Sequence, residues 1–408
     1  MRILLCHNRY QHAGGEDRVF EDEGALLEKY GHQVFRFTIS NDSIADLNRF
    51  ELVSKTFWNR AVASELKQII SHDRPEVVHF TNTFPLISPS AYKVAQDHGV
   101  GVVQSIHNYR MLCPKAQFVR NSQVCEKCLG KSFAWPAIYH ACYKDSRLAT
   151  TVVAAMTSFH RARSSWANLV DRFIAPTQFV KDKHVEGGFD QEQIEVKPNF
   201  VFPDPGIGQG NGNYAAFAGR LSAEKGVDTL LETWQHLREN IRLKIAGDGP
   251  LAERVKAAAM ADRRIEWLGR IEKKQMTELL GQATCMIMPS VCYETFGLTI
   301  VEAFAKGTPV VASKMGAMQE LVQDGRNGFL VEPGNARQFA EKVQQVFKMD
   351  SAELRLSARK DFELNYTAEA NHEWLTNIYS KTLASRVSSS AAPDPPMQQQ
   401  ASRQNQVL

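Results

Sequence analysis

Two glutamates, Glu294 and Glu302, lie eight positions apart in the segment YETFGLTIVEA and could grip the hydroxyl groups of a polyol. A carboxylate accepts two hydroxyl hydrogen bonds at once, which suits the vicinal diol of a ribose or a hexose. If a helix begins near Gly297, Glu302 lies in its early turns and Glu294 in the loop before it, so the two reach different ligand atoms. The backbone N–H groups from Phe296 to Leu298 would then open the helix and point at an anion. The alternative is that neither residue binds a ligand, with Glu302 an exposed helical glutamate and Glu294 an ordinary loop residue.

Two cations, Arg220 and Lys225, follow the apolar segment YAAFAG and are five positions apart. Cations that converge on a diphosphate stabilise it as a leaving group. Isolated basic residues more often lie on a solvated helix face. The position directly after an expected strand favours binding here, because ligands of open parallel sheets lie beyond the carboxyl ends of the strands.

A pair of glycines, Gly14 and Gly15, precedes an expected helix in the segment GGED. Their unsubstituted backbone would allow a phosphate or a sugar to approach the positive end of that helix. A simple turn, with Glu16 and Asp17 as favourable acids of the first helical turn, explains the same residues equally well. The segment GIGQG follows prolines in place of a strand, and no G-x-x-x-x-G-K-[ST] occurs, so neither a dinucleotide fingerprint nor a P-loop is predicted.

Four cysteines lie within the segment 113–142, including a C-x-x-C pair: Cys113, Cys125, Cys128 and Cys142. This spacing favours a closed tetrahedral zinc site of structural role, with His140 as a substitute ligand. A segment so poor in apolar periodicity would need such a staple to become ordered. Ordinary reduced thiols remain the alternative, and a redox role is disfavoured because no thioredoxin-like strand and helix flank the pair.

The composition is that of an ordinary globular protein, with 43% hydrophobic and 23% charged residues. A net charge of +3 is too small for the electrostatic footprint of a nucleic-acid-binding protein. No run of about 18 apolar residues is present, so no membrane-spanning helix is expected. The first residues, MRILLCHNRY, indicate a buried strand and no secretory signal, which predicts a cytoplasmic chain with reduced thiols.

These residues need elements to position them, and the sequence predicts two α/β domains. Apolar runs such as RILLC, HQVFRFTI and GVVQSIH alternate with helical patterns in the first half, which is typical of a parallel sheet wrapped by helices. A Pro- and Gly-rich connection, Lys197–Tyr214, separates domains 1–200 and 201–366, and the strand-and-helix pattern then restarts. The Ser-, Gln- and Pro-rich residues 385–408 are predicted to be disordered.

The segment Val152–Phe173 is expected to be helical and carries both apolar and basic residues, among them His160, Arg161 and Arg163. Such a helix can dock on anionic lipid, although packing on the sheet is the more common role.

Taken together, AGRLSAEKG, AGDGP, EWLGR, PSVCYETFGLTIVEAFAKGTPVVAS and GAMQELVQDGRNGFLVEPG resemble the motifs of the retaining glycosyltransferases of family 4. GGED, SIHNYRMLCP and the C-x-x-C segment are similar to a bacterial branch of that family with a Cys-rich N-terminal domain. The resemblance implies a GT-B fold, in which two Rossmann-like domains face each other across a cleft. It also implies that a helix at 367–384 returns to the N-terminal domain.

The same resemblance implies a donor substrate, a UDP- or GDP-type nucleoside-diphosphate sugar, bound by the C-terminal domain. Its diphosphate would be held by Arg220 and Lys225, its ribose by Glu302, and its sugar by Glu294 with Phe296, Gly297 and Leu298. Arg270 and Ile271 would lie by the base, His107 near the anomeric carbon, and Gly14 and Gly15 against the diphosphate.

The implied reaction is transfer of a hexosyl-type sugar with retention, to a glycan or a lipid-linked acceptor in cell-surface polysaccharide assembly. The departing phosphate would take the acceptor proton, and cationic side chains would replace a catalytic metal, which agrees with the absence of Asp-x-Asp. Peripheral contact with the inner face of the membrane and the oligomeric state stay open. One departure is Ala317 in GAMQE, where the family often has a second glycine, and it leaves the role of Glu320 undecided.

Two other functions fit the same residues. One is a sugar-nucleotide epimerase on the same fold, although the order of Arg220, Lys225, Glu294 and Glu302 favours transfer. The other is a zinc-stapled module that senses nucleotide sugars without turnover.

Overall fold

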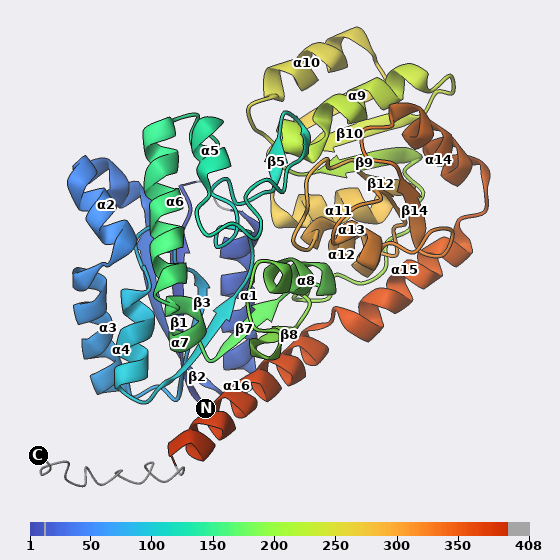
Figure 1. The fold of residues 1–408 in the computed structure, drawn as a ribbon. Coiled ribbons are helices and arrows are strands. Elements are labelled where there is room, and N and C mark those ends of the chain that lie inside the picture. The colour runs from blue at the N-terminus through green and yellow to red at the C-terminus, as the bar shows by residue number, and fades with distance from the viewer. Residues whose placement is uncertain (12–13, 391–408) are drawn as a thin grey trace, which may run out of the picture.

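The structure is a computed structural model that describes residues 1–11 and 14–390 (Figure 1). Within them, two six-stranded sheets, each parallel throughout, form the centres of two α/β domains that lie side by side. A short antiparallel hairpin forms a third sheet. The two parallel-sheet domains confirm the predicted GT-B fold.

The sheet of the N-terminal domain is buried at its centre. Its strands are β1 (Arg2–Arg9), β2 (Gln33–Ser40), β3 (Val77–Asn82), β4 (Gly101–Ser105), β7 (Arg172–Ala175) and β8 (Ile194–Val196), in the spatial order β2-β1-β3-β4-β7-β8. Its helices are α1 (Gly15–Lys29), α2 (Arg49–Phe57), α3 (Arg60–Asp73), α4 (Ser90–Asp97), α5 (Trp135–Tyr139), α6 (Arg147–Ala162), α7 (Ser165–Leu169) and α8 (Gln178–Glu186). Every residue of β3 and β4 is buried, because helices cover both faces of a parallel sheet.

The sheet of the C-terminal domain follows the same plan. Its strands are β9 (Tyr214–Ala218), β10 (Arg242–Ala246), β11 (Ile265–Gly269), β12 (Cys285–Met288), β13 (Val310–Ser313) and β14 (Gly328–Val331), in the order β11-β10-β9-β12-β13-β14. Its helices are α9 (Val227–His236), α10 (Ala252–Ala261), α11 (Lys273–Gln282), α12 (Leu298–Ala305), α13 (Met318–Leu321) and α14 (Ala336–Lys348). The strand order reverses between β9 and β12, so the loops that follow these two strands open a crevice at one edge of the sheet.

Two segments connect the domains. Between β8 and β9 the chain begins buried, at Lys197, Phe200 and Val201, and becomes largely exposed further along, whereas the sequence predicted exposure throughout. After α14, helix α15 (Ala352–Asn365) packs on α12, and helix α16 (Ala368–Ser390) crosses back to the N-terminal domain, where it packs on β4 and α1 (Figure 1).

Helix α16 ends at Ser390, so it includes the first six residues of the predicted disordered tail, 385–408. The rest of that tail, residues 391–408, lies outside the described residues.

The expected single helix over Val152–Phe173 is wrong. Helix α6 ends at Ala162, a second short helix α7 follows, and β7 begins at Arg172. Ser164 interrupts the helix because its backbone is left-handed, at φ 50°. Among the helices that the structure describes, none combines the length and the apolarity needed to cross a bilayer.

Candidate active site

The segment that carries the two glutamates, a loop followed by helix α12, begins after β12 near the centre of the C-terminal sheet. Glu294 lies in the loop, and α12 begins at Leu298, which places Glu302 in the second turn of the helix, as predicted. Gly297 caps the helix with φ 93°, a left-handed conformation that a residue with a Cβ adopts only under strain. The side chain of Phe296 is 3% exposed and packs in the core, so only the backbone of this residue faces a ligand.

Glu294 is held by a cation and a hydroxyl. Lys225 Nζ lies 2.7 Å and 2.9 Å from the two carboxylate oxygens, and Ser290 Oγ donates to Oε1 at 2.8 Å. Burial lowers the pKa of Lys225, but the Glu294 carboxylate outweighs it and keeps the pKa above its usual range. Lys225 is therefore a protonated cation, and the loops that follow β9 and β12 meet through this ion pair.

The other two predicted cations of this domain, Arg220 and Arg270, lie at the same edge of the sheet. Gly219 N donates to Ala246 O at 3.0 Å and Gly247 N donates to Gly269 O at 2.8 Å, so the carboxyl ends of β9, β10 and β11 are adjacent. Both arginines are exposed. Ile271 follows Arg270 directly, and its partly buried side chain packs against the apolar core.

The two domains touch where the predicted site residues lie. Thr295, next to Glu294, donates its Oγ1 to the carbonyl oxygen of His107 at 3.0 Å, and Thr177 Oγ1 donates to Thr295 O at 3.1 Å. Glu320 accepts from the backbone N–H groups of Gln178 and Phe179 at the start of α8. His107 of one domain and the Glu294 loop of the other are therefore direct neighbours.

The imidazole of His107 is enclosed at this boundary. Its Nε2 atom is buried and has no hydrogen-bond partner among the described residues. Burial lowers its pKa to about 3, although the Glu23 carboxylate acts in the opposite direction. His107 is therefore neutral at physiological pH and offers an uncharged donor or acceptor to a ligand.

The glycine pair begins α1 from the N-terminal side of the cleft. Gly14 N donates to Asp17 Oδ2 at 2.8 Å, and His7 Nε2 lies 2.9 Å from Asp17 Oδ1. A Cβ on Gly15 would meet nothing within 4 Å, so packing within the described residues does not require glycine at this position. The turn that the sequence left as an alternative is present, and it leaves room for a ligand.

Sequence reasoning missed the partner of Glu302. Arg18 of α1 donates to Glu302 Oε1 across the domain boundary, and Lys273 Nζ lies 3.6 Å from Asp22 Oδ1 on the same helix. Burial raises the pKa of Glu302, and the Arg18 charge opposes this shift. Arg18 stands three positions after Gly15, but nothing in its spacing reveals a partner on a different domain.

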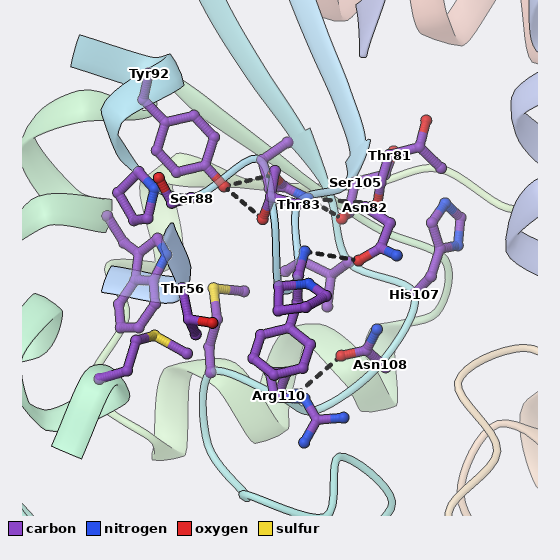
Figure 2. Close-up of a pocket in the computed structure, with 18 residues that line it drawn as sticks. Thr56, Thr81, Asn82, Thr83, Ser88, Tyr92, Ser105, His107, Asn108 and Arg110 are labelled. Atoms are coloured by element: carbon purple, nitrogen blue, oxygen red, sulfur yellow. Dashed lines mark hydrogen bonds between the residues drawn. The ribbon is translucent and has the colours of Figure 1, made fainter. Parts of the chain in front are cut away.

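A small cavity of about 60 Å³ opens in the N-terminal domain beside His107 (Figure 2). Hydroxyl and amide side chains dominate its polar lining, and they are Thr56, Thr81, Asn82, Thr83, Ser88, Tyr92, Gln104, Ser105 and Asn108. Arg110 stacks over the ring of Phe84 at 4.5 Å. Many hydrogen-bonding groups beside an aromatic wall suit a polyhydroxylated ligand.

The four cysteines gather around one small cavity with His140, on the loops that flank the hairpin of β5 (Val119–Arg120) and β6 (Gln123–Val124). All four are free thiols, and burial together with the other three cysteines raises the pKa of Cys128 to about 12. Within residues 1–11 and 14–390, no three His, Cys, Asp or Glu side chains are arranged as a metal site. The zinc ion therefore stays a prediction.

Comparison with known proteins matches both domains to glycosyltransferases. The family model described as Glycosyltransferase Family 4 matches residues 13–204, and the model described as Glycosyl transferases group 1 matches residues 212–349. An uncharacterized glycosyltransferase of Methanocaldococcus jannaschii is 24% identical over 78% of this chain and 86% of its own length. The alpha-D-kanosaminyltransferase of Streptomyces kanamyceticus is 27% identical over 65% of each chain.

Solved structures share the fold. Anabaena HepE in complex with UDP and glucose superimposes with a TM-score of 0.66 at 18% identity, covering 92% of this chain and 99% of that one. The sucrose-phosphate synthase of Thermosynechococcus elongatus gives a TM-score of 0.69 at 17% identity, covering 94% and 100%. With the two parallel-sheet domains, these matches identify the chain as a glycosyltransferase of GT-B fold that is similar to family 4.

Proposed function

We propose that this glycosyltransferase moves a hexosyl unit from a nucleoside-diphosphate sugar to an acceptor hydroxyl with retention of configuration. The observation that carries the proposal is the contact between Thr295 and His107. It brings the Glu294 loop, with its Lys225 cation, against the backbone of His107, a residue of the opposite domain whose imidazole is neutral. A sugar between these groups would meet hydroxyl acceptors on one side and an uncharged ring on the other.

Donor binding then requires an exchange of partners. In this structure Glu294 pairs with Lys225 and Glu302 pairs with Arg18. A diphosphate offers Lys225 and Arg220 a doubly charged partner, and the hydroxyls of the sugar and the ribose take the place of the cations on the carboxylates.

In the transfer step, the bond between the anomeric carbon and the phosphate oxygen breaks, and a bond from the acceptor oxygen forms on the same face of the sugar. The acceptor proton passes to the departing phosphate, so no carboxylate nucleophile is needed. Lys225 and Arg220 stabilise the negative charge that develops on the leaving diphosphate. His107 Nε2, which lacks a protein partner among the described residues, would bind a sugar hydroxyl.

The acceptor would bind in the pocket beside His107, where hydroxyls and amides can pair with a glycan. A glycan or a lipid-linked glycan in cell-surface polysaccharide assembly is the substrate class that we propose. For the donor, UDP-glucose is the first candidate to test, because the similar HepE was solved with UDP-glucose.

The test is a thermal-shift screen of UDP- and GDP-sugars, followed by an assay of nucleoside diphosphate release. A donor that binds only the folded chain raises its melting temperature. Transfer predicts that release of the diphosphate depends on added acceptor, and an anomeric proton NMR coupling of the product reports retention. Release without any acceptor together with an epimerised free sugar would indicate an epimerase. A donor-induced shift without turnover, for every acceptor offered, would indicate a sensor.

A further inference from the structure

The N-terminal domain exposes an apolar surface that its core does not use. Seven large aromatic side chains are exposed among the described residues, and six of them lie on or beside α2, α5 and α6: Phe50, Trp58, Phe133, Trp135, Tyr139 and Phe159. These three helices lie next to one another at one end of the domain, at the upper left in Figure 1. We call this set of six side chains, with the outer face of α6, the aromatic end.

The outer face of α6 is apolar, whereas the solvent-facing side of a surface helix is usually polar. Leu148, Val152, Ala155 and Phe159 follow at intervals of four, three and four residues, so they share one face. Leu148 is 67% exposed and Phe159 is 40% exposed. The opposite face is also apolar and packs into the domain, so the helix is apolar on both sides.

Aromatic contacts join α2 to this face. The rings of Phe57 and Phe159 meet edge to face at 5.8 Å, and Trp58 stacks on His160 at 6.5 Å. Phe50, at the start of α2, is 88% exposed. The aromatic side chains of α2 and α6 are therefore in contact, and neighbouring exposed apolar side chains mark sites of interaction.

Basic residues surround the aromatic end. From Lys131 to Arg163 the sequence contains five basic residues (Lys131, Lys144, Arg147, Arg161 and Arg163) and one acidic residue, Asp145. Lys131 lies 6.0 Å from the ring of Trp135, and Arg163 lies 5.1 Å from the ring of Phe159. Aromatic side chains with flanking cations are the composition of surfaces that insert at the headgroup level of anionic bilayers.

The aromatic end also adjoins the pocket beside His107. Thr56 of α2 and Met156 of α6 line that pocket from the inner sides of the two helices. A surface that rests on a bilayer would thus place the pocket close to the headgroups.

We propose that the aromatic end docks on the surface of an anionic lipid bilayer. Its aromatic side chains would enter the headgroup region while Lys131, Lys144, Arg147 and Arg163 contact lipid phosphates. Docking needs no turnover, so it can be tested apart from the proposed transfer reaction.

The test is co-sedimentation of the full chain with vesicles of phosphatidylglycerol mixed into phosphatidylcholine, beside vesicles of phosphatidylcholine alone. We expect binding to the anionic vesicles that weakens as salt is added, because charge attraction is screened. The triple variant F50S/W135S/F159S should lose at least about tenfold in vesicle affinity, which corresponds to ~1.4 kcal/mol. The matched control M260S/L364S removes exposed apolar side chains of the C-terminal domain and should bind as the unchanged chain does.

Circular dichroism and the melting temperature establish that each variant is folded. The proposal is overturned if the unchanged chain stays in solution with anionic vesicles, or if the folded triple variant binds them equally well. It is also overturned if light scattering shows a dimer that the triple variant dissociates while neither form binds vesicles, because the aromatic end would then contact a second copy.

Discussion

Lys225 and Glu294 form an ion pair that we propose the donor diphosphate breaks. The Lys225 ammonium is 2.7 Å from Glu294, on loops that follow two adjacent strands of one sheet. Because Glu294 keeps a hydrogen bond from Ser290, the loop retains one of its ties when the cation turns to a diphosphate. We therefore expect the charge of Lys225 to act mainly in the proposed reaction and only weakly in folding.

Replacing Lys225 with Met tests this assignment. We expect K225M to lower kcat/KM by about 10²- to 10³-fold, because it removes a preorganised charge from the leaving group. The melting temperature should change little, since the side chain is partly exposed and its loop is held by backbone bonds. K360M, which alters an exposed lysine of α15, is the control and should leave kcat/KM unchanged. Equal losses in both variants would contradict the role of Lys225.

A separate prediction concerns Arg18, because it forms an ion pair with Glu302, the carboxylate to which we assign binding of the ribose. If the donor must displace Arg18 from Glu302, R18M should tighten donor binding by about three- to tenfold, the range of an exposed to half-buried ion pair. Calorimetric titration of the donor measures the change. A weaker donor affinity in R18M would show instead that Arg18 contacts the donor.

At the scale of elements, helix starts decide where ligands can approach. Helix α12 needs Gly297 for its left-handed cap, whereas α1 begins at Gly15 with an open site for a Cβ. Backbone conformation therefore requires glycine at position 297, whereas neither conformation nor packing within the described residues requires it at position 15. The cap serves the fold, and the open site points to a ligand.

The variant Gly15→Ala tests whether a ligand, and not the fold, requires glycine at this position. Alanine is a better helix former than glycine by up to about 1 kcal/mol, so the variant should be as stable as the unchanged chain or slightly more so. If the backbone lies against a diphosphate, the added methyl group should raise the donor KM by about tenfold or more. Unchanged donor KM would leave GGED as a simple turn.

The cysteine-lined loops of the N-terminal domain predict a bound ion. Four thiols gather around one cavity, and burial raises the pKa of Cys128 to about 12 and also raises that of Cys142. Thiolates would therefore become favourable here only beside a bound cation. Metal analysis of the purified chain should find about one zinc per molecule, and a strong chelator or C128S should lower its melting temperature. C285S, at a buried cysteine outside the cluster, is the control for metal content. Zinc-free protein with unchanged stability would show that the thiols are simply reduced.

At the scale of the whole molecule, a buried polar network ties α16 to the N-terminal domain. Lys197 donates to Glu23 at 2.8 Å, and His79 lies 2.8 Å from the hydroxyl of Tyr379 on α16. Residues from the first domain, the linker and the last helix thus share one cluster. A buried network of this kind is destabilised strongly when one partner changes its charge.

Three histidines of this domain, the buried His79 and His184 and the half-buried His107, predict a loss of stability in mild acid. Burial lowers the pKa of His79 and His184 to about 4 and that of His107 to about 3. The folded chain therefore keeps these rings neutral while the unfolded chain protonates them below about 6.5. The free energy of unfolding is therefore unaffected by these rings above that pH. As the pH falls from there toward 4, it decreases by up to about 1.4 kcal/mol per pH unit for each ring.

Urea unfolding at about pH 7 and about pH 5 measures this effect. The free energy of unfolding should be smaller at the lower pH, and H184N should reduce the difference because it removes one titrating ring. His72, which is exposed, provides the control H72N. An equal difference in all three proteins would mean that other groups cause the acid sensitivity.

The sequence by itself determined the fold class and the places of many strands along the chain. Apolar runs such as CMIMPS and TPVVAS became β12 and β13, because wholly buried parallel strands leave a pattern that local reading detects. The helix start at Gly297 was predictable for the same reason, since caps depend on neighbouring residues.

Only the tertiary structure decided which distant residues meet. Arg18 and Glu302 are 284 positions apart, and Thr295 and His107 are 188 apart, so no local pattern relates them. The sequence also did not predict that the expected 152–173 helix breaks at Ser164, or that Lys197 is buried beside Glu23. Such contacts arise when two domains close on each other, and their free energy depends on geometry that periodicity does not encode.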